Sequence, residues 1–361
     1  MKNLLIYLYS VFRGIQVLLS SKKKIFNEIN IFYGGARSGN IGGTLVKIKR
    51  LKEYFPEYHF KFNIVYVLSN SPYLPLFALK ILKKRKIPIV HNQNGVFYPS
   101  WYKGDFRKKN KKMARQYSYA DYVFFQSRFC KNVAEKFLGE CYTPNEILYN
   151  AIDTNLYKPN KKIKKYNNDF IFLTTGKFAE IHFYHLKNTI LAISSLKYKK
   201  YRFKLLISGS LTKSLNQILD RLIKKNNLQQ QIFLTGVYKQ ESATSLYNEA
   251  DAFVYLLHQS PCPNSVIEAM SCGLPILYSD SGGIPEIVGN KCGVPLKVKL
   301  SFEKSFCPDI EVIQNGILKL INNYECYSKE SRLRAVNEFD IKYWIKRHEE
   351  VFRDLILKND N

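Results

Sequence analysis

The feature that most constrains the fold is an alternation of short apolar runs with helix-like segments, which occurs twice along the chain. Several of the apolar runs end in Gly or Ser, as strands do where a parallel sheet turns into a helix. The runs fall at residues 29–35, 63–69, 87–93, 122–127 and 145–153, and again at 170–176, 204–210, 232–237, 252–257 and 275–279. Strands that alternate with helices build parallel sheets from β-α-β units. We therefore expect an α/β protein with two Rossmann-like domains.

A polar, charge-rich segment without periodicity, KPNKKIKKYNND at 158–169, lies between the two halves and is typical of a linker. We expect an amphipathic extension at 1–24, a first domain at 25–160, a second at 161–338 and a final helix at 339–361. Folds of this kind bind ligands outside the carboxyl ends of their strands. The two sheets are therefore expected to face one another across a ligand-binding cleft.

The charge of the chain concerns its partners more than its fold. Lys and Arg number 56 against 29 Asp and Glu, a net charge of +27. Such a chain attracts polyanions or an anionic membrane surface, although a compositional bias toward Lys, Asn, Ile and Tyr would give the same excess. The 7 cysteines are odd in number and contain no C-x-x-C pair, so we expect a reducing compartment and neither a disulfide framework nor a zinc site.

The first 24 residues leave two interpretations open. Apolar side chains recur at helical spacing before a run of three lysines, and they are Leu4, Leu8, Val11, Ile15 and Leu18. Arg13 and Gln16 interrupt them, and no cleavage site follows, so a secretory signal is the weaker interpretation. The segment is either an interfacial helix on an anionic leaflet or a helix packed on the surface of its own domain. No apolar run is long enough to span a bilayer.

The stretch CPNSVIEAMSCG at 262–273 predicts a helix that can bind phosphate. Asn264, after Pro263, is expected as the N-cap, and Gly273 as the residue that ends the helix. The free amides of Ser265 and Val266 would then point out of the helix start, where anions bind.

Glu268 lies one turn further along this helix, among apolar neighbours. A buried carboxylate without a partner is costly, so it is either on a wet face or meets a polar partner that the chain itself does not supply. Two carboxylate oxygens can accept from two adjacent hydroxyls, as a ribose presents them. The helix is therefore expected to hold a diphosphate and a ribose.

Lys177 follows a strand-ending glycine in LTTGKF. A diphosphate leaving group gains negative charge, and one cation already aimed at it contributes roughly 3 kcal/mol or more. The chain contains no D-x-D motif, so it lacks the closely spaced pair of aspartates that could bind a metal ion. Lys177 together with the helix start is the metal-free alternative, unless Lys177 is simply one of many surface lysines.

The residues from 261 to 286 resemble the signature of the group 1 transferases of glycosyltransferase family 4. EAMSCGLP at 268–275 and SDSGGIPE at 279–286 are similar to its EAM-x-x-G-x-P and S-x-x-GG-x-PE motifs. LYNAIDTNLYKP at 148–159 and the segment from FLTGV to FVYLL at 233–257 agree with further motifs of that family.

The resemblance implies a GT-B fold and the retaining transfer of a sugar from a UDP- or GDP-sugar, without a further cofactor or metal. Glu268 would bind the ribose, the backbone of Asn264 and Ser265 would face the phosphates, and Lys177 would pair with them. Gly236 would lie against the base. The final helix would return to the first domain.

Two positions depart from the family pattern. Ser260 stands where the family has the first Glu of its pair, so that contact to the donor sugar is lost or made differently. The second basic residue of the family falls near His182, and Lys187 could take its place after a loop shift. Both departures concern the identity of the donor sugar.

In the first half, three features match the family's ligand-facing positions. Gly42 and Gly43, in a glycine-rich turn after a strand, let backbone approach a ligand. His91 ends a strand, where a neutral imidazole could bond a sugar hydroxyl or help to move the acceptor's proton. Asn94, in the polar run that follows, is a further binding candidate. A purely structural histidine and an ordinary turn are the alternatives.

Basic clusters at 82–86 and 106–116 flank Tyr98, Trp101 and Tyr102 in the first half. The family's first domain takes the acceptor, often on a lipid carrier, and an anionic membrane would attract these lysines and arginines. We therefore expect a cytoplasmic enzyme, peripheral on the inner face of the cell membrane, in surface polysaccharide or lipopolysaccharide synthesis. The alternatives are a non-catalytic sugar-nucleotide sensor and a nucleic-acid-binding protein, against which the dispersed charge argues.

Overall fold

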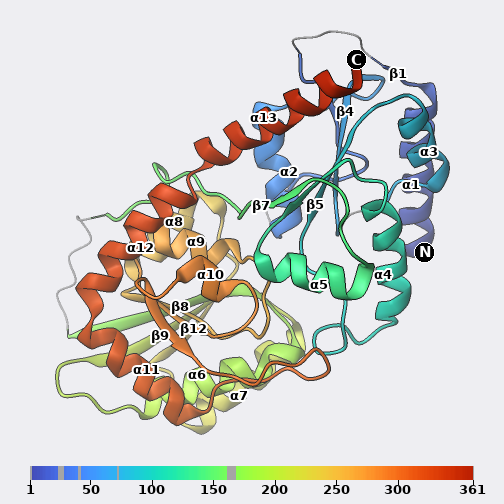
Figure 1. Ribbon diagram of the computed structural model, residues 1–361. Coiled ribbons are helices and arrows are strands. Elements are labelled where there is room, and N and C mark those ends of the chain that lie inside the picture. Colours follow the sequence, from blue (N-terminus) through green and yellow to red (C-terminus); the bar gives the residue numbers. More distant parts are fainter. Residues whose placement is uncertain (1, 23–27, 40–41, 71–72, 161–167, 361) are drawn as a thin grey trace. The chain divides into compact units, whose positions relative to one another are not determined.

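The computed structural model describes residues 2–22, 28–39, 42–70, 73–160 and 168–360 (Figure 1). The chain forms two compact units. Unit 1 comprises Met1–Asn150 and Lys342–Asn361, and unit 2 comprises Ala151–Ile341. Each unit is built around a parallel sheet covered by helices, which confirms the predicted fold class.

Unit 1 has a five-stranded sheet in the order β2-β4-β5-β6-β7, and every neighbouring pair is parallel. Its strands are β2 (Ile31–Phe32), β4 (Ile64–Leu68), β5 (Ile89–Gln93), β6 (Tyr122–Phe125) and β7 (Asn145–Ile147). All five lie within the apolar runs predicted as strands. The buried pattern of β4 explains this success, because strands covered on both faces are apolar, and β5 is equally buried although its last three residues, His91 to Gln93, are polar. A second, two-stranded parallel sheet pairs β1 (Ser21–Lys22) with β3 (Lys61–Phe62).

The helices of unit 1 include the final helix of the chain. They are α1 (Lys2–Leu19), α2 (Gly43–Tyr54), α3 (Leu76–Lys84), α4 (Phe106–Tyr117), α5 (Arg128–Leu138) and α13 (Ile341–Asp360). On α13, Phe352 packs edge-on against Phe55 and Tyr66. The His348 imidazole lies 3.1 Å from the Tyr66 hydroxyl, so the last helix is part of the core of this unit.

Unit 2 has a six-stranded parallel sheet in the order β10-β9-β8-β11-β12-β13. Its strands are β8 (Asp169–Phe178), β9 (Arg202–Leu211), β10 (Ile232–Gly236), β11 (Ala252–Tyr255), β12 (Ile276–Ser279) and β13 (Gly293–Leu296). The first five coincide with predicted runs. The sequence analysis did not predict β13, which has only four residues.

The helices of unit 2 cover this sheet. They are the 3-10 turn η1 (Glu180–His182), α6 (Phe183–Ser195), α7 (Lys213–Lys225), α8 (Gln240–Glu249), α9 (Asn264–Ser271), α10 (Ile284–Val288), α11 (Ile310–Asn322) and α12 (Tyr324–Glu338). Within the part of the chain that the structure describes, no helix is both long enough and apolar enough to cross a membrane.

The segment that enters unit 2 is fixed to it by one arginine. Arg332 on α12 donates to the carbonyls of Thr154 and Tyr157, at 3.1 and 2.9 Å. An isolated bridge also pairs Ile152 with Asp340. These bonds group residues 151–160 with unit 2, although the sequence analysis assigned them to the first domain. Most of the predicted linker, at 161–167, lies outside the described residues.

Candidate functional site

The carboxyl edge of the sheet in unit 2 gathers several of the predicted site residues. β8 and β11 are neighbours, and the chain winds away from them in opposite directions, toward β10 on one side and β13 on the other. This is a topological switch point, where sheets of this class bind ligands. Lys177 lies near the end of β8 and Gly236 ends β10, while Ser260 and α9 follow β11. The parallel order therefore places these elements at one edge.

The start of α9 differs from the prediction. Pro263 in extended conformation (φ −73°, ψ 120°), not Asn264, is the N-cap, and no side chain caps the helix. Asn264 is the first helical residue, because the ψ of 120° keeps the Pro263 backbone extended just before the helix. The Asn264 Oδ1 atom is buried and has no hydrogen-bond partner among the described residues.

One of the first three backbone amides of α9 already donates a hydrogen bond within the chain. Val266 donates its backbone N–H to the Pro263 carbonyl at 3.2 Å, so the expectation that this amide points out is wrong. Asn264 and Ser265 have no helical carbonyl in reach, because the first amides of any helix lack one. Two amides and the positive end of the helix dipole therefore remain for an anion.

The end of α9 is as predicted. Gly273 has a left-handed φ of +79°. Its amide donates to Met270 at 2.9 Å, and the amide of Leu274 donates to Ala269 at 3.0 Å. This is the Schellman pattern that glycine favours, because a side chain is strained at that φ.

Glu268 has a partner that the sequence analysis missed. The Tyr247 hydroxyl on α8 donates to the Glu268 Oε2 atom at 2.8 Å. Because the single proton of this hydroxyl is used there, the Thr175 hydroxyl, 3.3 Å away on β8, donates to Tyr247. Neither alternative of the sequence analysis, a wet face or a partner from outside the chain, included this internal donor. This hydrogen-bond chain connects Glu268 to β8, two residues before Lys177.

Burial and the negative charge of Glu268 together raise the pKa of Tyr247 well above its usual value. The tyrosine is fully buried, so it stays protonated and always acts as a donor to the carboxylate. Burial and Glu268 also raise the pKa of Tyr238, which follows β10. Cys272 shows the same two effects, and its pKa rises to about 12. Glu268 thus acts as an anion on three neighbouring side chains.

The glycine-rich motif after β12 supports the segment that precedes α9. Gly282 has φ +70°, and a Cβ atom there would lie 2.4 Å from the Ser260 carbonyl oxygen. Gly283 donates its amide to that carbonyl at 2.9 Å, and the Gln259 amide donates to the Ser281 hydroxyl, also at 2.9 Å. Only glycine permits this close approach, so the glycine-rich motif after β12 holds the backbone of residues 259–261 in place.

Ser260, at the position where a glutamate was expected, has a defined contact of its own. Its hydroxyl lies 2.9 Å from the hydroxyl of Tyr255, the last residue of β11. The side chain is half-buried at the carboxyl edge. It therefore offers a neutral hydroxyl where an anion was expected.

Four other candidates of unit 2 lie near the ends of strands: Lys177 is the last but one residue of β8, His182 and Lys187 follow β8, and Gly236 ends β10. Lys177 is exposed, and among the described residues its ammonium has no ion-pair partner. His182 is tied to the chain, because its Nδ1 atom accepts from the Ala179 amide at 3.0 Å, and burial lowers its pKa. Lys187 is half-exposed on the first turns of α6. Gly236 has φ +74°, with no atom within 4 Å of the position a Cβ would take.

In unit 1, the predicted residues fall at the corresponding edge of its sheet. Gly42 and Gly43 are exposed at the start of α2, and a Cβ on either would meet no atom within 4 Å. Asn94 follows β5, and its amide donates to the Ser69 hydroxyl at 2.9 Å. The two glycines therefore leave room for a ligand beside the start of α2.

His91 lies in the interior of unit 1, with no exposed surface. Its Nε2 atom is 2.8 Å from Gln93 Oε1, and burial lowers the pKa of the imidazole to about 4. Its Nδ1 atom has no partner among the described residues. The ring is therefore neutral near pH 7, as the sequence analysis assumed, but enclosed.

Two family models match the chain. The one described as "Glycosyl transferases group 1" matches residues 158–335, and the one described as "Glycosyltransferase Family 4" matches residues 26–156. The two matches adjoin, and together they cover both units except for the two ends of the chain.

Similar proteins extend this result. An uncharacterized glycosyltransferase of Methanocaldococcus jannaschii is 24% identical over 263 residues, 64% of this chain and 63% of that protein. A probable sucrose-phosphate synthase of Thermosipho melanesiensis is 30% identical over 124 residues, 33% of this chain and 26% of that protein. The matched region thus spans less than two thirds of either relative.

Solved structures share the fold at low sequence identity. HepE of Anabaena, solved in complex with UDP, superimposes with a TM-score of 0.65 at 15% identity, over 86% of this chain and 82% of that one. A glycosyltransferase of Rickettsia africae also gives a TM-score of 0.65 at 15% identity, over 96% and 94% of the chains. Both are GT-B proteins in architecture, and the likeness establishes that fold for this chain.

Proposed function

Because this chain belongs to the group 1 glycosyltransferases of glycosyltransferase family 4, we propose that it moves a sugar from a nucleoside-diphosphate sugar to an acceptor hydroxyl with retention. The observation that supports this most strongly is the position of Glu268. Its carboxylate is held by Tyr247 at the switch point of the sheet, one turn inside a helix whose first two amides are available. That is the arrangement that a ribose and a diphosphate require side by side.

Each group has one task in this proposal. A carboxylate can accept about four hydrogen bonds, so the contact with Tyr247 leaves capacity for the ribose hydroxyls. The amides of Asn264 and Ser265 and the Lys177 ammonium stabilise the charge that grows on the diphosphate as the glycosidic bond breaks. Contacts of this kind contribute roughly 3 kcal/mol each to the transition state.

The remaining candidates have supporting roles in this proposal. Gly236 provides an open backbone surface for the base, and Ser260 provides a hydroxyl for the donor sugar. His182 and Lys187 are secondary candidates on the phosphate side. In unit 1 we propose Gly42, Gly43 and Asn94 for donor or acceptor contacts, with His91 supporting them through its neutral ring.

We propose a UDP-sugar as the first donor to test, because HepE, which has the same fold, was solved with UDP and with UDP and glucose. For the acceptor we propose a glycan or lipid-linked hydroxyl in cell-surface polysaccharide or lipopolysaccharide synthesis, at the inner face of the cell membrane. The net charge of +27 favours an anionic membrane surface as the setting.

One observation favours a second candidate, a sugar-nucleotide sensor without transferase activity. Ser260 replaces an anionic side chain with a hydroxyl that already contacts Tyr255. A site that binds the nucleotide but cannot orient the sugar would bind without turnover.

Thermal-shift screening with UDP-, GDP- and ADP-sugars, followed by an assay of donor hydrolysis, tests both candidates. A ligand at a hundred times its Kd raises the stability of the folded protein by about 2.7 kcal/mol. Stabilisation with turnover supports the transferase, whereas stabilisation without turnover on any donor supports the sensor. No stabilisation by any nucleotide would refute both.

A further inference from the structure

The helix α1 (Lys2–Leu19) presents an apolar stripe outward. Residues at helical spacing form this stripe, and they are Leu4, Leu8, Phe12, Ile15 and Leu19. Their exposed fractions lie between 42% and 68%. Single exposed apolar side chains need no explanation, but a continuous stripe along a whole helix marks an interaction surface.

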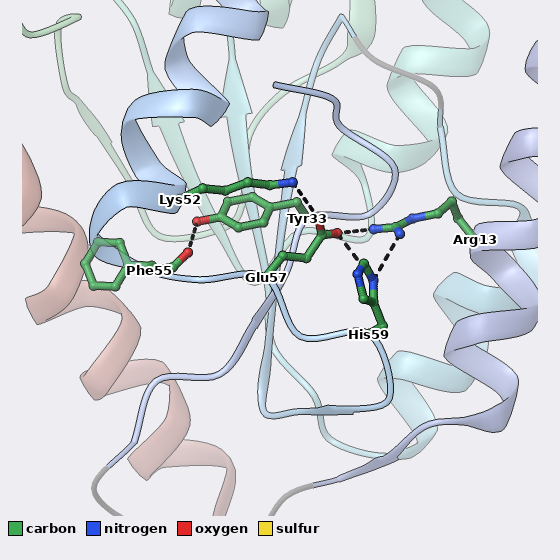
Figure 2. Close-up of polar contacts among 6 residues, drawn as sticks. All are labelled: Arg13, Tyr33, Lys52, Phe55, Glu57 and His59. Carbon is green, nitrogen blue, oxygen red and sulfur yellow. Dashed lines mark hydrogen bonds and ion pairs between the residues drawn. The ribbon is translucent and has the colours of Figure 1, made fainter. Parts of the chain in front are cut away.

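The opposite face of α1 packs on the protein, and it combines the polar side chains of Arg13 and Gln16 with Gly14 and the core residue Val17. Arg13 and Gln16, which interrupt the apolar pattern in the sequence, are both buried. The Arg13 guanidinium pairs with Glu57 (Figure 2). It also lies 4.3 Å from the centroid of the Phe32 ring. Burial would raise the pKa of Glu57, but Lys52 and Arg13 together lower it, so the pair stays charged.

Further contacts fix this orientation. Figure 1 shows α1 beside α3, and a Cβ on Gly14 would meet Pro75 at 2.5 Å and Phe77 at 2.6 Å. Arg85, just after α3, donates to the carbonyls of Val17, Leu18 and Ser20 at 2.7 to 2.9 Å. Because the buried face is locked inward, α1 cannot rotate to bury its stripe against unit 1.

Apolar residues at the start of α3 lie beside the stripe, and basic residues lie further along α3. Leu76 and Phe77, at the start of α3, are 37% and 41% exposed and continue the apolar surface. Lys80 and Lys84 are exposed further along α3. Neither α1 nor α3 contains Asp or Glu. An apolar stripe on helices whose own charged side chains are all basic complements a bilayer with anionic headgroups, whereas a second copy of this surface would bring like charges together.

We propose that α1 lies in the headgroup region of an anionic bilayer, with the stripe toward the acyl chains and Arg13 toward the protein. The surface defined by the stripe, Leu76 and Phe77 enters the membrane, and the lysines of α3 contact headgroup phosphates. This inference deepens the membrane setting of the proposed function, since it names the surface that brings the acceptor-binding unit to a lipid-linked acceptor.

Sedimentation of the full chain with vesicles tests the proposal. The wild type should bind vesicles of equal parts phosphatidylglycerol and phosphatidylcholine more tightly than vesicles of phosphatidylcholine alone. Leu8→Glu with Phe12→Glu should weaken binding to the anionic vesicles by roughly tenfold or more. The matched control is Leu333→Glu with Ile218→Glu, two exposed apolar residues of unit 2, which should change nothing. Equal binding by the α1 variant and the wild type would overturn the proposal.

A conservative variant covers the case in which the charged substitutions perturb folding. Tryptophan introduced by Phe12→Trp should be quenched by brominated lipid in anionic vesicles, whereas tryptophan introduced by Leu333→Trp should not. Absence of this quenching would overturn the proposal. So would a wild-type dimer in solution that Phe12→Glu converts to monomer, because a second copy would then cover the stripe.

The same variants separate this proposal from the proposed function. UDP-dependent stabilisation of each variant is measured without lipid. If vesicle binding fails while UDP still stabilises the chain, only the membrane surface is refuted. If UDP has no effect while α1 binds vesicles, the nucleotide site is refuted and the membrane surface stands.

Discussion

The hydroxyl of Tyr247 donates to the carboxylate of Glu268 over 2.8 Å, although 21 residues separate the two in the chain. Tyr247 is fully buried and holds one carboxylate oxygen of Glu268, which as a residue is only partly buried. A carboxylate aimed in this way needs no reorganisation when a ribose arrives, which favours binding.

Replacing this donor tests its role in positioning. Tyr247→Phe removes one hydrogen bond to a charged group, an interaction of about 1.5–3 kcal/mol. We expect the affinity for the nucleoside diphosphate to fall about tenfold or more while the fold remains. Tyr33→Phe is the matched control, because Tyr33 is also buried and donates one hydrogen bond, to the Phe55 carbonyl at 2.7 Å in unit 1. Titration calorimetry of both variants measures the effect, and equal affinities would contradict it.

Lys177→Ala should lower turnover by more than about a hundredfold, because one cation aimed at the leaving diphosphate contributes roughly 3 kcal/mol or more. Lys177→Arg should restore most of the rate, since it keeps the charge. Lys213→Ala, an exposed lysine at the start of α7, is the control and should leave the rate unchanged. Steady-state kinetics with the donor found by screening measures all three. A normal rate in Lys177→Ala would remove Lys177 from the site.

Gly282→Ala should displace the segment before α9. The new Cβ would lie 2.4 Å from the Ser260 carbonyl and 2.6 Å from the backbone of Gln259, at φ +70°. Gly139 also has a positive φ, +108°, but a Cβ there meets nothing within 4 Å, so Gly139→Ala isolates the strain of the φ alone. We expect Gly282→Ala to lose at least about 1 kcal/mol more stability than Gly139→Ala, and to bind nucleotide more weakly. Equal losses of unfolding free energy in urea would contradict this, because they would mean that the backbone of residues 259–260 moves away from the new Cβ at no cost.

The stability of unit 1 should fall in acid. Burial lowers the pKa of His91 to about 4 and that of His348 to about 3, from 6.5 in the unfolded chain. Below pH 6.5 the unfolded chain therefore binds protons that the folded chain does not. The contribution of these histidines to the unfolding free energy of unit 1 therefore keeps its full value above pH 6.5. It falls between pH 6.5 and pH 4 by about 1.4 kcal/mol per pH unit for each histidine.

Tryptophan fluorescence measures this effect, because Trp101 and Trp344 both lie in unit 1. His348→Gln keeps hydrogen-bonding atoms beside Tyr66 and the Trp344 carbonyl but removes the titrating group. We expect it to reduce the slope of unfolding free energy between pH 6.5 and pH 4.5 by about 1.4 kcal/mol per pH unit. An unchanged slope would mean that His348 is not kept neutral by burial.

Local patterns predicted the fold better than they predicted the site. The strands of the two large sheets, except β13, followed from apolar runs, and Gly273 followed from the left-handed conformation that ends many helices. The N-cap was placed one residue late, because Asn264 is a common cap by type but Pro263 occupies the cap by geometry.

Contacts between distant segments could not be predicted from the sequence, for a physical reason. The bond from Tyr247 to Glu268 depends on how α8 packs, which no periodicity records. Tyr247 lies in the segment at 233–257, which the sequence analysis used only for its resemblance to the family's motifs. In the same way, apolar spacing in residues 4–18 indicates an amphipathic helix but not its direction. The buried pair of Arg13 and Glu57 decides which face turns inward, and Glu57 is 44 residues away.

The most direct test of the central claim is a cycle of four dissociation constants, in which wild type and Glu268→Gln each bind UDP and 2′-deoxy-UDP, or the guanine pair if screening selects it. If Glu268 accepts from the ribose, the wild type should prefer the ribonucleotide by about tenfold or more, and the variant should lose most of that preference. A preference that is the same in wild type and Glu268→Gln would contradict the account.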